Sequence, residues 1–398
     1  MLLLNPQKRR TDVTPKRHSE GEFEFLDRVE NPFFDRVRQL LNQWFEHMPE
    51  DMQPELRKRF MSRFSWQFAA TFWELYVHET LQRAGWNLSP HPSVAGTDSV
   101  PDFLAERDGF SFYIECTVAN TNIDPTGSGK RRTVLYDALD RVKSPNFYLS
   151  IDLEAIGPRD PPLNRLQRTL EIWLSTLDPD SIVVSPDGTV SEGLPTFRWD
   201  RGDGWLLTFQ ALPKKPEARG EAGRRTLGLP GVVVSWENHR DPLLHALRQK
   251  ASRYGLLGRP YIIAVLDLDS PSADVEDIAD ALYQPLPSWL DPRQDNGRRM
   301  SRPVDGFWAG LTGPQHLQVS AVLTAGDLRP WTVCKSIPTL WQNPSTDYPL
   351  TALLPWPSIS GNPLGPSAIS TDAPMPLHQL YGLDETWPGS ENPWRSQQ

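Results

Sequence analysis

The sequence has few cysteines and no long apolar run, and both absences restrict the class of protein. Cys116 and Cys334 are the only cysteines among 398 residues. Two cysteines cannot build a disulfide framework or a cysteine-based zinc site, so we expect a reducing environment. No apolar stretch approaches the roughly 18 residues that a membrane-spanning helix needs. The start, MLLLNPQKRR, places its apolar residues before its charges, the reverse of a secretory signal. We therefore expect a soluble, cytoplasmic protein with no membrane partner.

Signatures of several enzyme classes are also missing. No Gly-x-Ser-x-Gly motif is present, and the eight histidines are scattered singly, which excludes the usual serine-hydrolase elbow and a histidine-rich zinc site. Residues 124–131 imitate a phosphate-binding loop after an apolar strand. However, Asp124 stands where that motif needs its first glycine, and Arg131 replaces the serine or threonine that follows its lysine. Nucleotide binding is therefore disfavoured.

The composition is that of a globular protein with an acidic balance. Hydrophobic residues make up 38% and charged residues 23% of the chain. Lysine and arginine number 41 against 50 aspartates and glutamates, which gives a net charge of −9. This balance argues against a surface covered in positive charge for indiscriminate nucleic-acid binding, although a local basic groove is compatible with it.

Changes in pattern along the chain indicate an α/β protein with five segments. Helical spacing at the start gives way to short apolar strands, and a helix followed by a fully apolar strand returns after residue 240. The segments are a helical N-terminal extension (1–64) that begins with a loose basic arm, the first part of the core (65–154), a helix with a β-rich insertion (155–240), the second part of the core (241–335) and a C-terminal wrap (336–398).

The C-terminal wrap is rich in proline and tryptophan. Eleven prolines lie between Pro338 and Pro393. Because proline removes backbone donors, we expect this tail to lack regular structure and to cover the surface, held by its tryptophans. Tryptophans exposed there would suit an interface with a partner protein.

Three acidic residues are arranged so that they can converge. Glu74 lies in the helix expected over 65–83, Asp102 follows Pro101 at the start of a strand, and Glu115 lies within the strand expected over 110–119. A hairpin of this size places Asp102 and Glu115 at neighbouring positions of adjacent strands, and the packed helix brings Glu74 within reach. Three convergent carboxylates typically hold Mg²⁺ or Mn²⁺, and such an ion can activate water and neutralise a phosphate.

This order of residues resembles the PD-(D/E)xK nuclease superfamily, the fold of many restriction endonucleases. The resemblance implies a mixed sheet flanked by helices, and metal-dependent phosphodiester hydrolysis of nucleic acid, foremost as a DNA endonuclease. Asp102 and Glu115 match the two metal-binding carboxylates of the family, and Glu74 resembles the acid of its first helix. The motif lysine is replaced by Thr117, which carries no positive charge and would only support the site.

The missing lysine has two candidate replacements. In some members of the superfamily this lysine has moved to the following helix. The helix expected over 241–254 contains Lys250, which we regard as the replacement, together with Gln249 and Tyr254 as supporting residues. Lys143, before the strand expected over 146–153, is the alternative if the core helix comes earlier.

A basic run near the strand with Glu115 is a candidate nucleic-acid contact. Lys130, Arg131 and Arg132 lie in an expected loop and can bind phosphates without reading bases, although such loop charges are often merely solvated. No sequence-reading module is evident, so an associated protein or the structure of the DNA would choose the target. Two active sites on duplex DNA would favour a homodimer. Members of the superfamily commonly occur in bacterial defence systems and mobile elements, and the resemblance suggests the same setting here.

A second hypothesis is a catalytically inactive nuclease fold, kept for binding DNA or a partner protein. Loss of the motif lysine at Thr117 supports it. The two hypotheses differ at Lys250, which lies beside Glu115 if the site is complete and points into solvent if the site has decayed.

Overall fold

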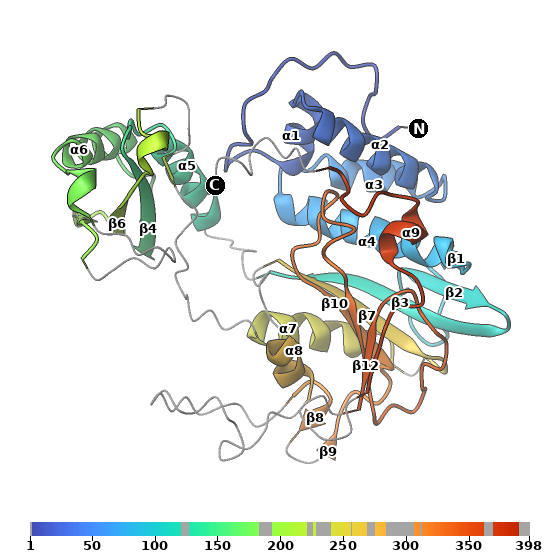
Figure 1. Cartoon of the computed structure of the whole chain (residues 1–398). Coiled ribbons are helices and arrows are strands. Elements are labelled where there is room, and N and C mark those ends of the chain that lie inside the picture. Colours follow the sequence, from blue (N-terminus) through green and yellow to red (C-terminus); the bar gives the residue numbers. More distant parts are fainter. Residues whose placement is uncertain are drawn as a thin grey trace. The chain divides into compact units, whose positions relative to one another are not determined.

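The computed structural model describes most of the chain and divides it into two compact units (Figure 1). The described residues are 2–120, 127–182, 193–220, 226–227, 240–255, 257–268, 275–283, 306–310, 313–361 and 369–389. The first unit, called the core unit below, comprises Met1–Val13, Gly21–Thr121 and Asn238–Ser390. The second, called the inserted unit, comprises Thr14–Glu20, Asn122–Glu237 and Glu391–Gln398.

A mixed sheet forms the centre of the core unit. Its strands follow the order β1-β2-β3-β7-β10-β11-β12-β13. β1, β2 and β3 pair antiparallel, whereas β3, β7 and β10 run parallel to one another. Every residue of β7 is buried, as expected of a central parallel strand. The strands are β1 Asn87–Pro90, β2 Phe103–Arg107, β3 Phe110–Ala119, β7 Tyr261–Asp267, β10 Ala321–Ala325, β11 Thr339–Gln342, β12 Ser358–Ser360 and β13 Ile369–Thr371. The two short strands β8 (Ala309–Gly310) and β9 (Gly313–Pro314) pair with each other.

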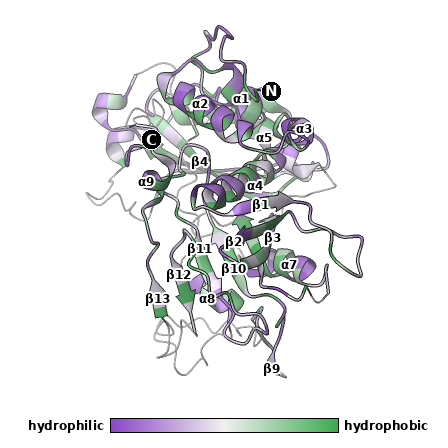
Figure 2. Cartoon of the chain, turned by 90° about the vertical axis from the view of Figure 1, so that its right-hand side faces the viewer, coloured by the Kyte–Doolittle hydropathy of each residue, from purple (hydrophilic) through white to green (hydrophobic). Residues whose placement is uncertain are grey.

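Helices cover both faces of this sheet, which confirms the expected α/β arrangement. Figures 1 and 2 show α4 (Ser65–Arg83) on one face, with α7 (Arg240–Ala251) and α8 (Val275–Leu282) on the other. On the α4 face, the indole of Trp73 donates to the carbonyl oxygen of Ala264 in β7 at 3.0 Å. In the described part of the chain, no helix combines the length and the hydropathy that a membrane span requires.

The N-terminal extension is helical, as predicted, and packs on α4. It comprises α1 (Glu22–Arg28), α2 (Pro32–Glu46) and α3 (Gln53–Phe60). Asn31 caps α2 by accepting a hydrogen bond from the Phe33 N–H, and a proline occupies the first turn. The apolar residues expected at helical spacing are all buried: Phe33, Phe34, Val37, Leu40, Leu41, Trp44 and Phe45.

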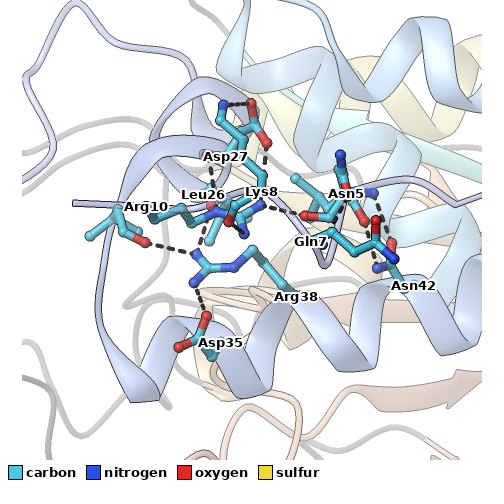
Figure 3. A network of polar contacts seen from close by, with 11 residues as sticks. Asn5, Gln7, Lys8, Arg10, Leu26, Asp27, Asp35, Arg38 and Asn42 are labelled. Atoms are coloured by element: carbon cyan, nitrogen blue, oxygen red, sulfur yellow. Dashed lines mark hydrogen bonds and ion pairs between the residues drawn. The ribbon is translucent and has the colours of Figure 1, made fainter. Parts of the chain in front are cut away.

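The first residues of the chain do not form the loose arm that we expected. Leu3 and Leu4 are buried, and the backbone of Leu4 exchanges two 2.8 Å hydrogen bonds with the side-chain amide of Asn42 (Figure 3). Lys8 and Arg10 both pair with Asp27. The apolar start therefore binds to α2 because its leucines remove apolar surface from water and Asn42 satisfies the buried backbone.

The inserted unit has its own three-stranded sheet, β4-β6-β5, formed by β4 (Phe147–Ala155), β5 (Thr196–Asp200) and β6 (Leu206–Pro213). The helices α5 (Ser128–Leu139) and α6 (Leu163–Ser175) pack on it through a shared apolar cluster. We had assigned the strand over 146–153 to the core and ended the core segment at residue 154. Instead β4 pairs with β6, because an apolar strand can join either sheet and its sequence does not specify which.

The C-terminal region is more regular than its proline content predicted. β11, β12 and β13 extend the main sheet, and a short helix, α9 (Leu377–Tyr381), follows. Trp341 and Trp356 are fully buried, so they offer no surface to a partner; Trp394 lies outside the described residues. The hydroxyl of Tyr381 lies 2.7 Å from that of Thr80, which anchors this region to α4.

We expect replacement of Arg38 by methionine to lower the free energy of unfolding by about 2 to 4 kcal/mol. The buried guanidinium donates to the carbonyl oxygens of Leu26 (2.7 Å) and Val29 (3.1 Å), and methionine leaves both acceptors buried without their donor. Urea unfolding followed by circular dichroism measures the change. The matched control, Arg9→Met at an exposed position, should alter stability by less than about 0.5 kcal/mol. Equal stability of the two variants would contradict this role.

Candidate active site

A tight hairpin sets the register of the two strands that carry the acidic residues. Arg107 of β2 pairs with Phe110 of β3, and Asp108 and Gly109 form the two-residue turn with φ of 52° and 80°. Positive φ at both central positions is the geometry of a type I′ turn, for which Asp-Gly is a preferred sequence. The register is therefore fixed locally by the sequence of the turn.

This register brings Asp102 and Glu115 together, as the sequence predicted. Phe103 pairs with Ile114, so that Asp102, one residue before β2, falls opposite Glu115. A carboxylate oxygen of Asp102 accepts a hydrogen bond from the backbone N–H of Cys116 at 2.6 Å. The Asp102 side chain is thus held against the strand beside Glu115.

Glu115 is the most heavily contacted residue of the site. Its side chain is only 3% exposed, and Oε1 accepts a hydrogen bond from the ammonium group of Lys250, which is 135 residues away in the sequence. Oε2 accepts a hydrogen bond from the hydroxyl of Tyr254 at 2.5 Å, and the guanidinium of Arg253 lies 3.3 Å from Oε1. Lys250, Arg253 and Tyr254 are spaced i, i+3 and i+4, so one helical face of α7 and its C-terminal turn supplies all three donors.

Burial and the charges of two neighbouring acids raise the pKa of Asp102. Burial is the largest cause, and the negative charges of Glu115 and Glu74 add to it, raising the pKa of Asp102 to about 8. The Cys116 N–H and the Lys250 ammonium act in the opposite direction without cancelling the effect. Burial therefore keeps the Asp102 carboxyl mostly protonated at neutral pH, because the Cys116 N–H and the Lys250 ammonium do not offset it.

Glu74 has a different environment from the other two acids. It is buried on α4, and burial raises its pKa, while the guanidinium of Arg59 from α3, at 2.5 Å, opposes that shift. Its carboxylate is thus already paired with a cation from the neighbouring helix.

Any metal site here would depend on Asp102 and Glu115, because Glu74 is already paired with Arg59. Over the residues that the structure describes, no group of three or more His, Cys, Asp or Glu side chains is placed to hold a metal ion. Asp102 and Glu115 nonetheless offer oxygen donors at adjacent positions of neighbouring strands, and Asp102 forms no ion pair with a described residue. Carboxylate oxygens are the ligands that Mg²⁺ and Mn²⁺ prefer, and solvent would have to supply the remaining ligands.

The remaining candidates are divided between the two units. Thr117 is partly buried and pairs with Val265 in β7, and Gln249 is exposed on α7. Lys143 belongs to the inserted unit, where its backbone N–H donates to Glu171.

The basic run at Lys130, Arg131 and Arg132 also belongs to the inserted unit, and it lies in α5 rather than in the expected loop. The assignment to a loop was wrong because the neighbouring glycines suggested a turn, whereas Gly127, with φ of 73°, directly precedes the helix. Whether these cations contact nucleic acid stays a prediction.

Two cations of the site, Arg253 and Arg59, were not predicted from the sequence. Arg253 follows Lys250 by three residues, and helical spacing alone could have identified it. Arg59 gave no such signal, because its contact with Glu74 depends on how α3 packs against α4.

Comparison with known proteins identifies no relative of this chain. No protein-family model, curated protein or solved structure matches this chain.

We expect Asp102→Asn to stabilise the metal-free protein, and to do so more at pH 8.5 than at pH 5. The folded chain holds the Asp102 proton up to about pH 8, whereas the unfolded chain releases it near the ordinary value of 3.8. Between these values the folded state binds more protons, so the contribution of this group to the free energy of unfolding falls as pH rises. Asparagine does not ionise and avoids that loss.

Thermal melts of wild type and variant in EDTA at the two pH values measure the effect. The melting temperature of the variant should exceed that of wild type by several degrees at pH 8.5. A variant that melts below wild type at both values would contradict the charge repulsion inferred here.

Proposed function

We propose that this chain is a metal-dependent nuclease that hydrolyses phosphodiester bonds, with DNA as its main substrate. The observation that carries the proposal is the contact between Lys250 and Glu115. The resemblance to PD-(D/E)xK nucleases requires a lysine beside this glutamate, and the strand has threonine instead. The contact of the Lys250 ammonium group from α7 with this glutamate supports the proposal that Lys250 replaces the motif lysine.

The arrangement of the core unit supports the same proposal at the level of the fold. The mixed sheet has the helix with Glu74 on one face and the helix with Lys250 on the other, as expected for a restriction-endonuclease-like core (Figure 1). Asp102 and Glu115 lie on the strand pair between these helices.

Each side chain of the site has a distinct part in this proposal. Asp102 and Glu115 would hold Mg²⁺ or Mn²⁺, which would lower the pKa of a bound water and neutralise charge on the phosphate. Lys250 would orient the attacking water and place positive charge beside the phosphate. The Tyr254 hydroxyl fixes the orientation of the Glu115 carboxylate, since burial and the hydrogen bond to Glu115 raise the pKa of Tyr254 and keep it a neutral donor.

A second candidate function is binding of DNA or of a partner protein without catalysis. The observation in its favour is that Glu115 already has two cationic partners, Lys250 and Arg253. A carboxylate neutralised in this way binds a metal ion only if one of these cations moves, and Arg253, with a side chain 46% exposed, is the freer to do so.

Cleavage of supercoiled plasmid and of single-stranded DNA in Mg²⁺ or Mn²⁺ tests the main proposal. We expect Glu115→Gln and Asp102→Asn each to reduce the rate of cleavage by about 100-fold or more, because each removes charge needed for the metal ion. Gel assays at equal protein concentration measure the rates, and thermal melts check that both variants fold. Cleavage by wild type that survives both substitutions would exclude this site as its origin.

Replacing Lys250 separates the two candidate functions. We expect Lys250→Met to lower the cleavage rate by about 100-fold while retaining affinity for DNA, since general acid–base and charge-stabilising groups typically contribute that much. His245→Ala, at an exposed position of the same helix, is the control and should cleave like wild type. A wild type that binds DNA but cuts nothing, with Lys250→Met binding equally well, would support the binding function instead.

A further inference from the structure

The connection between α3 and α4 combines positive charge with exposed apolar side chains. We call residues 57–66 the α3–α4 corner. From residue 57 to residue 73 the chain has four cationic residues and no acidic residue, in a protein whose net charge is −9. The cationic residues are Arg57, Lys58, Arg59 and Arg63.

Three of these cations have no acidic partner within the described part of the chain. Arg59 pairs with Glu74, whereas Arg57, Lys58 and Arg63 form no ion pair with any described residue. Cations at the end of α3 also stabilise that helix through its dipole. That explanation does not extend to Arg63, which lies beyond the end of the helix at Phe60.

The apolar side chains of the corner are unusual in their exposure. Phe64 is 49% exposed, and it is the only Phe, Tyr or Trp classed as exposed among the described residues. The neighbouring Met61 is 48% exposed, and the Arg63 guanidinium lies over the Phe64 ring, 5.1 Å from its centroid. An exposed apolar side chain alone is common on protein surfaces, but an exposed aromatic ring among cations is the combination that binds nucleic acid strands.

The corner is fixed in place and adjoins the candidate active site. A Cβ atom on Gly21 would lie 3.3 Å from the Cα of Arg63, so the absence of a side chain lets the start of α1 pack closely against the corner. Arg59 belongs to the corner and contacts Glu74, whose charge acts on Asp102. The corner is thus connected through Arg59 to one of the three acids of the candidate site.

We propose that the α3–α4 corner binds single-stranded nucleic acid, with Arg57, Lys58 and Arg63 on the phosphates and Phe64 stacked on an unpaired base. Proteins bind single strands through a basic track combined with exposed aromatic rings, because every base presents a face for stacking. The inference rests on the proposed function for the choice of nucleic acid over other polyanions. To the proposed function it adds a substrate class, namely a nucleic acid strand whose bases are unpaired near the scissile bond.

Binding without metal tests this inference separately from cleavage. Fluorescence anisotropy of the full chain in EDTA, with a labelled single strand of about 16 nucleotides and a duplex of equal length, measures the dissociation constants. We expect the single strand to bind more tightly than the duplex. The double variant Arg63→Ala/Phe64→Ala should weaken single-strand binding about tenfold, and should lower the slope of log affinity against log salt by about 0.7.

Two further variants distinguish stacking from a structural role. Phe64→Trp should keep the affinity of wild type, whereas Phe64→Leu, which is apolar but cannot stack, should lose several-fold. The matched control Lys335→Ala/Ile337→Ala removes a cation and an exposed apolar side chain elsewhere in the core unit and should bind like wild type. Unchanged binding by the Arg63/Phe64 variant, preference for duplex, or binding only to phosphatidylserine vesicles would overturn the inference.

The results also separate failure of this inference from failure of the proposed function. If Glu115→Gln abolishes cleavage while the Arg63/Phe64 variant binds normally, only the assignment of the corner is wrong. If no protein cleaves but the corner variants lose single-strand binding, the binding surface stands and the catalytic proposal fails.

Discussion

The parallel pairing of β3 with β7 is the interaction on which the core unit and its candidate site depend. It places Glu115 opposite Ile263 and sets β3 beside the strand that follows α7. Parallel strands cannot be joined by a hairpin, so the chain must cross over between them, and α7 lies at the end of that crossover. Because α7 packs against both strands, Lys250 on the helix and Tyr254 in the turn that follows it reach the carboxylate of Glu115.

Much of this arrangement could be predicted from local sequence. The helix over 65–83 and the strand over 110–119 have the expected boundaries, because each combines a long periodic pattern with clear turn residues at its ends. The opposition of Asp102 and Glu115 follows from the length of the hairpin, which the Asp108-Gly109 turn fixes. The position of Lys250 was predicted only through the resemblance to a nuclease family, since nothing local specifies a partner 135 residues away.

Other features depend on tertiary packing and were predicted wrongly or missed. β4 has the apolar sequence of a core strand, yet it joins the sheet of the inserted unit. The short strand β11 forms although the nearby prolines disfavour regular structure. Burial of Trp341 and pairing with β10 stabilise the strand by more than the prolines destabilise it. The contact of Arg59 with Glu74 likewise follows from packing between helices, which sequence periodicity does not encode.

The inserted unit occupies the crossover between β3 and α7, and this position has a consequence for how the chain can change. The entropy cost of closing a loop grows only with the logarithm of its length, so doubling the length costs about 0.6 kcal/mol. A crossover that must exist for topological reasons can thus accept a folded insertion of any size at nearly constant stability of the core. The inserted unit can therefore be replaced by another folded segment without separating Glu115 from Lys250. The long loop closure is instead expected to slow folding.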